Sequence, residues 1–201
     1  METFDIKIQE LEYKYRADGI SLAKFQIFAE EQGPVKVVYV GSYDTYFSLI
    51  DKNSSITTTG LEFVRYRQGT KPELTIKIKT KEANNNSRVE IDLPLTKKAT
   101  KYLVTAFLKW FGFKENFEVY KDCYIYFYEK IDIVYYIVKS EENGKKIAAF
   151  IEIEARKDAK FDSEEQAWTL VKEMEQKLSV LGITPANRLR KSMWEMFQKN
   201  D

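Results

Sequence analysis

Charged side chains recur two residues apart in five segments that otherwise have the composition of β-strands. This pattern limits the possible folds more than any other feature of the sequence. Successive side chains of a strand point to opposite faces, so residues two apart share a face. The five sets are Glu10, Glu12 and Lys14; Arg65 and Arg67; Lys77 and Lys79; Arg88 and Glu90; Glu152 and Glu154. Each set therefore defines one charged strand face, whose opposite face is mainly apolar.

The signs of these charges are grouped along the chain. Acidic residues dominate the first and last sets, and basic residues the middle ones. A solvated outer face explains any single pair, but five grouped sets favour a shared, enclosed face. A cavity lined by several basic residues needs a strongly anionic occupant to offset their repulsion. Carboxylates in the same cavity make sense if a divalent cation lies between them and the anion. The pattern therefore predicts a cavity for a polyphosphate and a metal.

The rest of the chain supports an α+β fold. Runs rich in Val, Ile, Tyr, Phe and Thr predict eight strands, at residues 7–16, 35–40, 60–67, 74–80, 87–93, 118–127, 131–138 and 147–155. Apolar periodicity and caps predict helices at residues 20–32, 96–111, 163–181 and 185–198. Eight strands can close a barrel, and helices would cover its apolar outside. No linker divides the chain, so we expect a single domain over residues 1–201.

Composition excludes several kinds of chemistry. The chain has no histidine and one cysteine, so His-based nucleophilic systems and His-containing zinc sites cannot form. Any metal would be bound mainly by oxygen, which makes Mg²⁺ or Mn²⁺ the expected ion. The net charge is +1, so a basic field for duplex nucleic acid is absent. Without a visible secretory signal or an apolar run of ~20 residues, we expect a cytoplasmic protein with no membrane partner.

The order of the charged motifs resembles the triphosphate tunnel metalloenzymes, also called the CYTH superfamily. This superfamily contains class IV adenylyl cyclases, thiamine triphosphatases and inorganic triphosphatases. Its E-x-E-x-K signature is similar to residues 10–14, and its D-x-Y-F/Y segment to residues 44–47. The other charged sets follow in the family's order, and Leu181–Ile183 with an aromatic segment at 191–197 resembles its C-terminal part. The resemblance spans residues 8–197 and implies an antiparallel eight-stranded closed tunnel barrel covered by helices.

The resemblance also implies roles for individual residues. The expected phosphate ligands are Lys14, Arg65, Arg67, Lys77, Lys79, Arg88 and Lys121. The expected ligands of Mg²⁺ or Mn²⁺ are Glu10, Glu12, Glu152 and Glu154, and the expected catalytic residues are Glu10, Glu12, Lys14 and Glu90. The implied function is metal-dependent hydrolysis of a small-molecule triphosphate: inorganic tripolyphosphate, a nucleoside triphosphate or a related compound. Adenylyl cyclase activity and a weakly catalytic nucleotide- or polyphosphate-binding protein are the alternatives. The sequence leaves open whether the chain forms a homodimer.

The sequence departs from the family pattern at two places. The family's basic K/R-x-R pair corresponds to Lys121-Asp122-Cys123, so only Lys121 is present. The family's acidic residue on the strand before the closing E-x-E has no clear equivalent, since Asp132 lies too early unless the register differs. Among residues outside the motifs, Trp110, Trp168 and Trp194 lie on helical patterns and are expected in the core.

Overall fold

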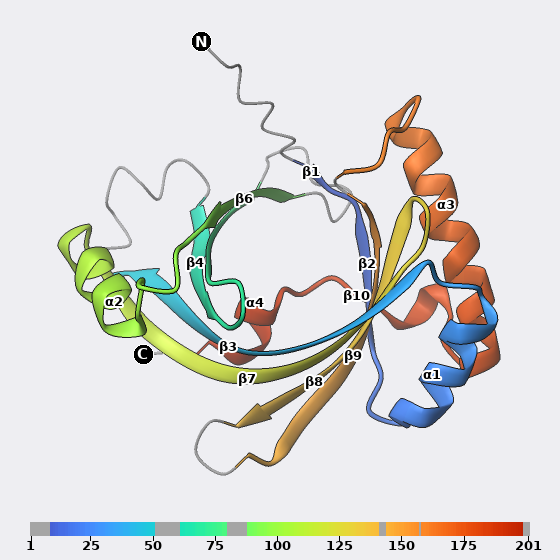
Figure 1. The fold of residues 1–201 in the computed structure, drawn as a ribbon, viewed down its shortest axis with the longest axis horizontal. Helices are drawn as coiled ribbons and strands as arrows, with labels where there is room; N and C mark the ends of the chain where they lie inside the picture. Colours follow the sequence, from blue (N-terminus) through green and yellow to red (C-terminus); the bar gives the residue numbers. More distant parts are fainter. Residues whose placement is uncertain (1–8, 51–60, 80–87, 141–143, 157, 199–201) are drawn as a thin grey trace. The chain divides into compact units, whose positions relative to one another are not determined.

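The structure, a computed structural model, describes residues 9–50, 61–79, 88–140, 144–156 and 158–198. Of Gln9, Glu10, Lys79, Arg88 and Val89, it describes the backbone alone. The chain is α+β and its strand pairs are antiparallel, as the sequence predicts (Figure 1). The helices are α1 (Leu22–Glu31), α2 (Lys101–Trp110), α3 (Glu164–Lys177) and α4 (Met193–Phe197), with short 3-10 turns η2 (Leu178–Leu181) and η3 (Pro185–Asn187).

Ten strands are present in the described residues. They are β1 (Gln9–Glu10), β2 (Glu12–Arg16), β3 (Lys36–Leu49), β4 (Leu61–Gln68), β5 (Glu73–Lys79), β6 (Arg88–Pro94), β7 (Phe113–Phe127), β8 (Ile131–Ser140), β9 (Lys146–Ala155) and β10 (Arg188–Leu189). The prediction of eight strands is therefore too low. The predicted first strand is divided at Leu11: β1 pairs with β6, whereas β2 pairs with β9. The very short β10 pairs with β2.

The described residues do not show the predicted closed barrel. In the hydrogen-bonded order of the strands, β1 and β10 are the two ends, and no closure between them is detected. The chain forms two compact units, each assembled from separate segments. Unit 1 consists of residues 1–10, 42–119 and 193–201, and unit 2 of residues 11–41 and 120–192. The long strands β3 and β7 contribute residues to both. The expectation of one domain over residues 1–201 stays a prediction.

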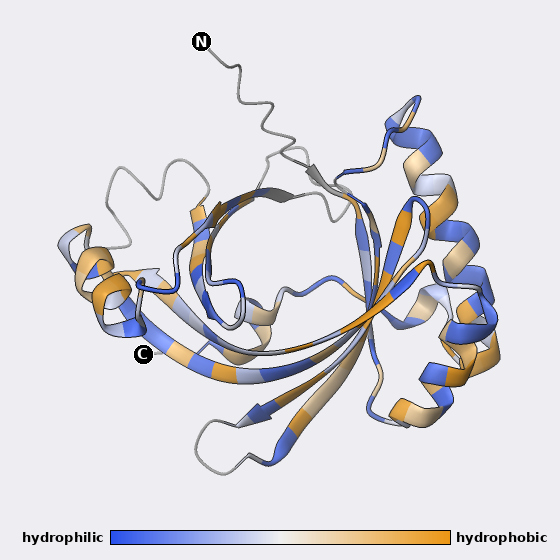
Figure 2. Cartoon of the chain, viewed as in Figure 1, coloured by the Kyte–Doolittle hydropathy of each residue, from blue (hydrophilic) through white to orange (hydrophobic). Residues whose placement is uncertain are grey.

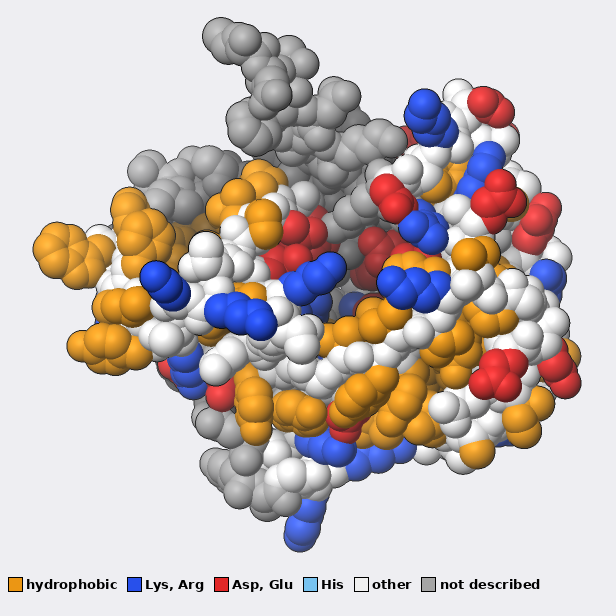
Figure 3. All heavy atoms as spheres, viewed as in Figure 1, with side chains coloured by type: hydrophobic (Ala, Val, Ile, Leu, Met, Phe, Trp, Pro, Cys, Tyr) orange, Lys and Arg blue, Asp and Glu red, His pale blue; other side chains and the backbone are white. Residues whose placement is uncertain are grey.

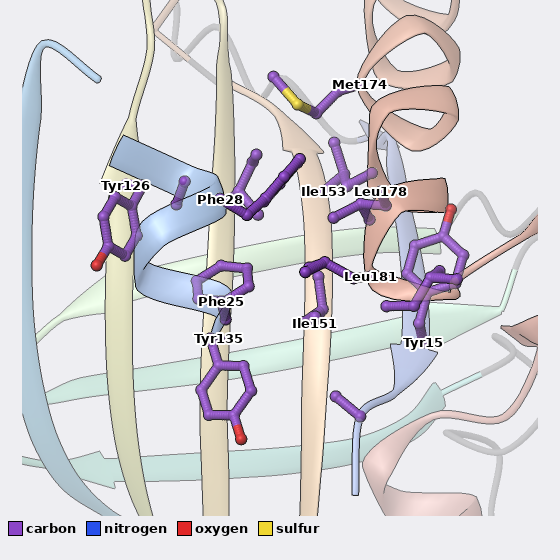
Figure 4. Packing of buried hydrophobic residues seen from close by; sticks show 14 of the residues in the cluster. Tyr15, Phe25, Phe28, Tyr126, Tyr135, Ile151, Ile153, Met174, Leu178 and Leu181 are labelled. Carbon is purple, nitrogen blue, oxygen red and sulfur yellow. The ribbon is translucent and has the colours of Figure 1, made fainter. Parts of the chain in front are cut away.

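Unit 2 contains the larger apolar core. Strands β7, β8, β9, β2 and β10 follow one another in its hydrogen-bonded order. Helices α1 and α3 supply apolar side chains to one face of these strands (Figure 4). Ser21 caps α1 by accepting from the Lys24 backbone, and buried Phe25, Phe28 and Ala29 then recur at helical spacing. Polar and apolar residues alternate along the strands, as Figure 2 shows, because only one face is covered.

An ion pair to a buried carboxylate fixes the end of α3. Glu175 accepts a hydrogen bond of 2.6 Å from the Tyr15 hydroxyl and pairs with Arg188 of β10. The Arg188 guanidinium lies 3.7 Å from the centre of the Tyr13 ring. These contacts correct the predicted helix at 185–198. The segment instead makes the turn η3, pairs with β2 through Arg188 and Leu189, and becomes helical again only in α4.

Unit 1 has a smaller core beneath α2. Val104 and Leu108 of α2 pack with Phe47, Val64, Tyr66, Leu74 and Phe113. The helix ends at Gly112, whose φ of 78° is the left-handed conformation favoured at this position. On the other side of these strands, Trp194 of α4 packs against Tyr46, Phe63 and Phe117. The expectation of a core position is therefore confirmed for Trp194 but wrong for Trp110, which is 91% exposed.

Candidate functional site

The predicted site residues of unit 1 lie on one strand face because their strands are paired in register. Asp44 is opposite Arg67, and Arg67 is opposite Glu73. Further along, Thr75 is opposite Asp92, Lys77 opposite Glu90 and Lys79 opposite Arg88, which in turn is opposite Glu10. For Glu10, Lys79 and Arg88 this placement comes from the backbone alone. The unit thus brings together all the predicted site residues of strands β1, β4, β5 and β6.

Buried carboxylates hold the two arginines of this face. Arg67 makes a bidentate pair with the fully buried Asp44, its Nε lying 2.8 Å from Oδ1 and its Nη2 2.9 Å from Oδ2. Arg65 donates from Nη2 to the Thr75 hydroxyl at 2.7 Å and lies 3.6 Å from Glu90 Oε1. Burial and the Arg67 charge lower the pKa of Arg65, but the nearby carboxylates of Asp44 and Glu90 outweigh them and raise it. The guanidinium therefore stays charged.

Arg65 nevertheless keeps one unused donor. Its Nε is buried and has no hydrogen-bond partner among the described residues. A buried N–H without an acceptor is costly, and an anionic oxygen is the acceptor that a guanidinium binds best. On the neighbouring strands, Lys77 Nζ lies 3.2 Å from Glu90 Oε2, and the Thr75 hydroxyl donates to Asp92 at 2.8 Å. Unit 1 therefore holds the cations Arg65, Arg67 and Lys77 in fixed positions, and Arg65 Nε is a donor that lacks an acceptor among the described residues.

Acidic residues of three adjacent strands form a row in unit 2. Glu12 of β2 is opposite Glu154 of β9, and Glu154 is opposite Asp132 of β8. The strand register thus aligns Asp132 with the closing E-x-E motif, which corrects the expectation that it lies too early. Sequence position alone could not reveal this alignment, because the length of the β8–β9 turn fixes the register. Asp132 therefore lies on the same strand face as Glu154 and Glu12.

Lys14 and Glu152 form the next row. Lys14 Nζ lies 2.8 Å from Glu152 Oε1 and 3.7 Å from Glu12 Oε1. The Tyr136 hydroxyl donates to the same Glu152 oxygen at 2.8 Å, and Lys121 Nζ lies 5.5 Å from the centre of the Tyr136 ring. Burial raises the pKa of Glu152, but the Lys14 ammonium and these hydrogen bonds outweigh it and lower the pKa. Glu152 is therefore an ionised carboxylate already paired with a lysine.

Asp132 is held less closely by its basic partner than Glu152 is. In the part of the chain that the structure describes, its Oδ1 is buried and accepts no hydrogen bond, and Arg156 Nε lies 3.9 Å away. Burial raises the pKa of this carboxyl to about 6, against a smaller lowering by Arg156. All the possible metal ligands in this row are oxygen atoms, and one of them, Asp132 Oδ1, is buried and accepts no hydrogen bond among the described residues. Such a row suits a hard divalent cation. Within the described ranges, however, no three acidic side chains are grouped closely enough to form a finished metal site.

Comparison with solved structures identifies the fold class. The chain matches a Pyrococcus horikoshii protein with a TM-score of 0.68 and 20% identity, over 94% of this chain and 99% of the other. It matches structures described as "a putative adenylate cyclase" from Vibrio parahaemolyticus (TM-score 0.64, 15% identity, 93% and 96% coverage) and Bacillus halodurans (0.62, 16%, 94% and 96%). The chain therefore has the CYTH-like fold that the charged motifs predicted. At sequence identities of 15–20%, this similarity shows the fold alone.

The sequence itself assigns the chain to a family. The MSV199 domain model matches residues 92–192, half of the 201 residues, and the chain belongs to the MSV199 domain family. No curated protein matches it. Within the described segments, no helix has the length and apolar character needed to cross a membrane.

Proposed function

We propose that the chain is a divalent-metal-dependent hydrolase of a small-molecule triphosphate, such as inorganic tripolyphosphate or a nucleoside triphosphate. One observation carries the proposal: two of the buried polar atoms without a hydrogen-bond partner belong to the predicted phosphate-binding arginine pair and to the carboxylate row. Arg65 Nε in unit 1 is a donor without an acceptor, and Asp132 Oδ1 in unit 2 is an acceptor without a donor, among the residues described. The first suits a phosphate oxygen and the second a cation, which are the two components that such a hydrolase binds.

In this proposal the residues of unit 1 bind phosphate. Arg65, Arg67 and Lys77 neutralise the charge on the phosphate oxygens, and their carboxylate partners hold them in position beforehand. Lys79 and Arg88 extend the same strand face by their register. Phosphoryl transfer depends mainly on such positioning and neutralisation of charge. Glu90 contacts both Arg65 and Lys77, so its proposed role is to orient these two cations.

The proposed residues of unit 2 hold the cation. Glu12, Glu154 and Asp132 would bind Mg²⁺ or Mn²⁺ through oxygen, with Glu152 as the further acidic residue of this unit expected from the sequence. Glu10, which the sequence also predicts as a metal ligand, belongs to unit 1. When bound, the ion supplies Lewis-acid charge stabilisation. Lys14, held between Glu12 and Glu152, can donate to a phosphate oxygen, and Lys121 adds positive charge beside Glu152. An ionised carboxylate of the row can accept the proton of the attacking water.

Phosphate release tests the proposal. The protein would be incubated with tripolyphosphate and with each nucleoside triphosphate, in the presence of Mg²⁺ or Mn²⁺. We expect release of phosphate that chelation by EDTA abolishes. Glu12→Gln and Glu154→Gln should each lower kcat at least about 100-fold, since both act where transition-state charge develops. Glu165→Gln, on the exposed start of α3, is the matched control. No turnover with any substrate, or variants equal to the wild type, would refute the hydrolase.

Adenylyl cyclase activity is the second candidate, favoured by the two structural neighbours that are each described as "a putative adenylate cyclase". In that reaction the ribose 3′-oxygen attacks the α-phosphorus, its proton goes to a base, and pyrophosphate leaves. Mass spectrometry of the products formed from ATP separates the candidates: a hydrolase yields ADP and phosphate, whereas a cyclase yields cyclic AMP and pyrophosphate.

A binding protein without turnover is the third candidate. It is favoured by the close pairing of Arg67 and Lys14 with carboxylates, which leaves less charge for catalysis. Isothermal titration calorimetry that shows tight triphosphate binding, together with no product formation, would support this candidate.

A further inference from the structure

Helix α2 of unit 1 is apolar on two opposite faces. Its inner stripe, Val104 and Leu108, packs on the strands of the unit. Its outer side carries large apolar side chains that are mostly exposed: Tyr102 80%, Leu103 55%, Phe107 58%, Trp110 91%, and Phe111 just beyond the helix 56%. Figure 3 shows apolar side chains standing out from the surface over α2. A helix that packs on a core from one side needs only one apolar stripe, so the second one requires another explanation.

The exposed surface is large for a single helix. Five such side chains, at roughly 150–250 Å² each, present on the order of 700 Å² when scaled by their exposed fractions. Apolar patches larger than a few hundred Å² usually mark interaction sites. The Phe107 and Phe111 rings lie 4.9 Å apart, and together with Ala106 and Trp110 they line an open pocket of about 440 Å³. The aromatic surface is therefore continuous, and we name the five side chains the α2 patch.

Positive charge flanks the α2 patch at both ends. Lys97 and Lys98 lie exposed just before the helix, and Lys109 is exposed in its last turn. Within the described ranges, the exposed Glu115 lies near the start of α2, where it pairs with Lys101 at 2.9 Å. The flanks therefore carry net positive charge. A complementary partner combines an apolar layer with negative charge.

In contrast to the absence of a membrane partner expected from the sequence, we propose that the α2 patch docks this protein on an anionic lipid surface. Trp and Tyr rings favour the boundary between acyl chains and headgroups, and flanking lysines reach the anionic headgroups. A second copy of the chain fits less well, because docking α2 against α2 brings Lys97, Lys98 and Lys109 of both copies together. A helix of 10 residues is far shorter than the ~20 residues needed to cross a bilayer, so the association lies at the surface.

Vesicle co-sedimentation tests this proposal with the full chain. We expect binding to mixed phosphatidylcholine–phosphatidylserine vesicles, weak binding to pure phosphatidylcholine, and a loss of binding as salt is raised. Replacing Phe107 and Trp110 by Ser should weaken binding more than tenfold. Each of Lys97→Gln, Lys98→Gln and Lys109→Gln should weaken it roughly fivefold.

Matched controls keep the test specific. Ile27→Ser removes a comparably exposed apolar side chain from α1 of unit 2, and Lys160→Gln removes an exposed lysine elsewhere. Both should bind vesicles like the wild type, and all variants should keep the wild-type circular dichroism spectrum. The proposal is overturned if anionic vesicles do not bind, or if the control variants lose as much binding as the α2 variants. A concentration-dependent dimer in analytical ultracentrifugation that the Phe107 and Trp110 changes abolish would overturn it in favour of self-association.

Discussion

The two units differ in how their buried charged groups are paired. In unit 1, buried carboxylates hold guanidinium groups, and one of the buried atoms without a hydrogen-bond partner is a donor, Arg65 Nε. In unit 2, a lysine holds one carboxylate of the row, and the atom left over is an acceptor, Asp132 Oδ1. Both statements concern the residues that the structure describes. The comparison teaches that the fold pairs many of its buried charges internally but leaves single atoms of charged groups, among them Arg65 Nε and Asp132 Oδ1, without a hydrogen-bond partner.

Removal of Asp44 should have the largest effect, because it breaks the internal neutralisation of unit 1. Asp44→Ala leaves Arg67 without its bidentate partner and the neighbouring Arg65 with less compensating charge. We expect a loss of about 3–5 kcal/mol in the free energy of unfolding, measured by urea denaturation. The double variant Asp44→Ala with Arg67→Met should recover part of the loss. Equal stability of Asp44→Ala and the wild type would show that the pair contributes nothing.

The open donor of unit 1 can be tested without changing the charge. Arg65→Lys keeps the positive charge but lacks Nε, so we expect triphosphate affinity to fall about 10- to 100-fold. Calorimetric titration measures the effect. The same substitution at the exposed Arg190 is the control. Unchanged affinity of Arg65→Lys would mean that the open donor has no role in binding.

The open acceptor of unit 2 predicts a pH dependence of stability. The folded pKa of Asp132 is about 6, above the unfolded value, so the folded chain binds more protons between these values. Stability should therefore fall as pH rises from about 4 to about 7. In Asp132→Asn, the decrease in the free energy of unfolding over this pH range should be smaller by on the order of 1–2 kcal/mol, after allowance for partial solvent exposure. Denaturation curves at several pH values measure it.

Magnesium gives a companion test of Asp132. If the carboxylate row binds the ion, Mg²⁺ should stabilise the wild type at pH 7 and stabilise Asp132→Asn less. Thermal unfolding with and without the ion is the measurement. Arg65→Lys serves as the comparison and should respond like the wild type, since it lies in the other unit. An equal response of Asp132→Asn and the wild type would contradict the assignment.

A smaller change should follow from the contact that holds Glu152. Tyr136→Phe deletes the 2.8 Å hydrogen bond to Glu152 but leaves Lys14 in place. We expect a loss of about 1 kcal/mol in stability. Because the contact also lowers the pKa of Glu152, this pKa should rise in the variant, which NMR titration of the carboxyl group can measure. Tyr43→Phe, on an exposed tyrosine of unit 1, is the control.

Part of this molecule could be predicted from sequence because strand geometry is periodic. Two-residue spacing fixes which side chains share a strand face, so the charged sets were identified together with the α+β antiparallel class. Register between strands is set by turns and packing, so the alignment of Asp132 with Glu154 and Glu12 could not be read from the sequence. The pairing of Asp44 with Arg67 was hidden for the same reason.

The errors also have physical causes. Trp110 was expected in the core because apolar spacing shows that a helix has an apolar face but not how many such faces are covered. The helix predicted at 185–198 was interrupted because Arg188 gains a buried partner, Glu175, and a backbone ladder with β2. In both cases the structure depends on tertiary contacts, or on their absence, which the local sequence pattern does not reveal.

The discontinuous make-up of the units has a consequence for synthesis of the protein. Unit 1 needs Trp194 to complete the cluster with Tyr46, Phe63 and Phe117, yet 73 residues of unit 2 intervene between its second and third segments (120–192). During synthesis, the aromatic cluster around Phe63 therefore remains incomplete until translation has passed residue 194. We therefore expect the nascent chain to expose part of this aromatic surface, of the kind that chaperones bind, until its last residues are made.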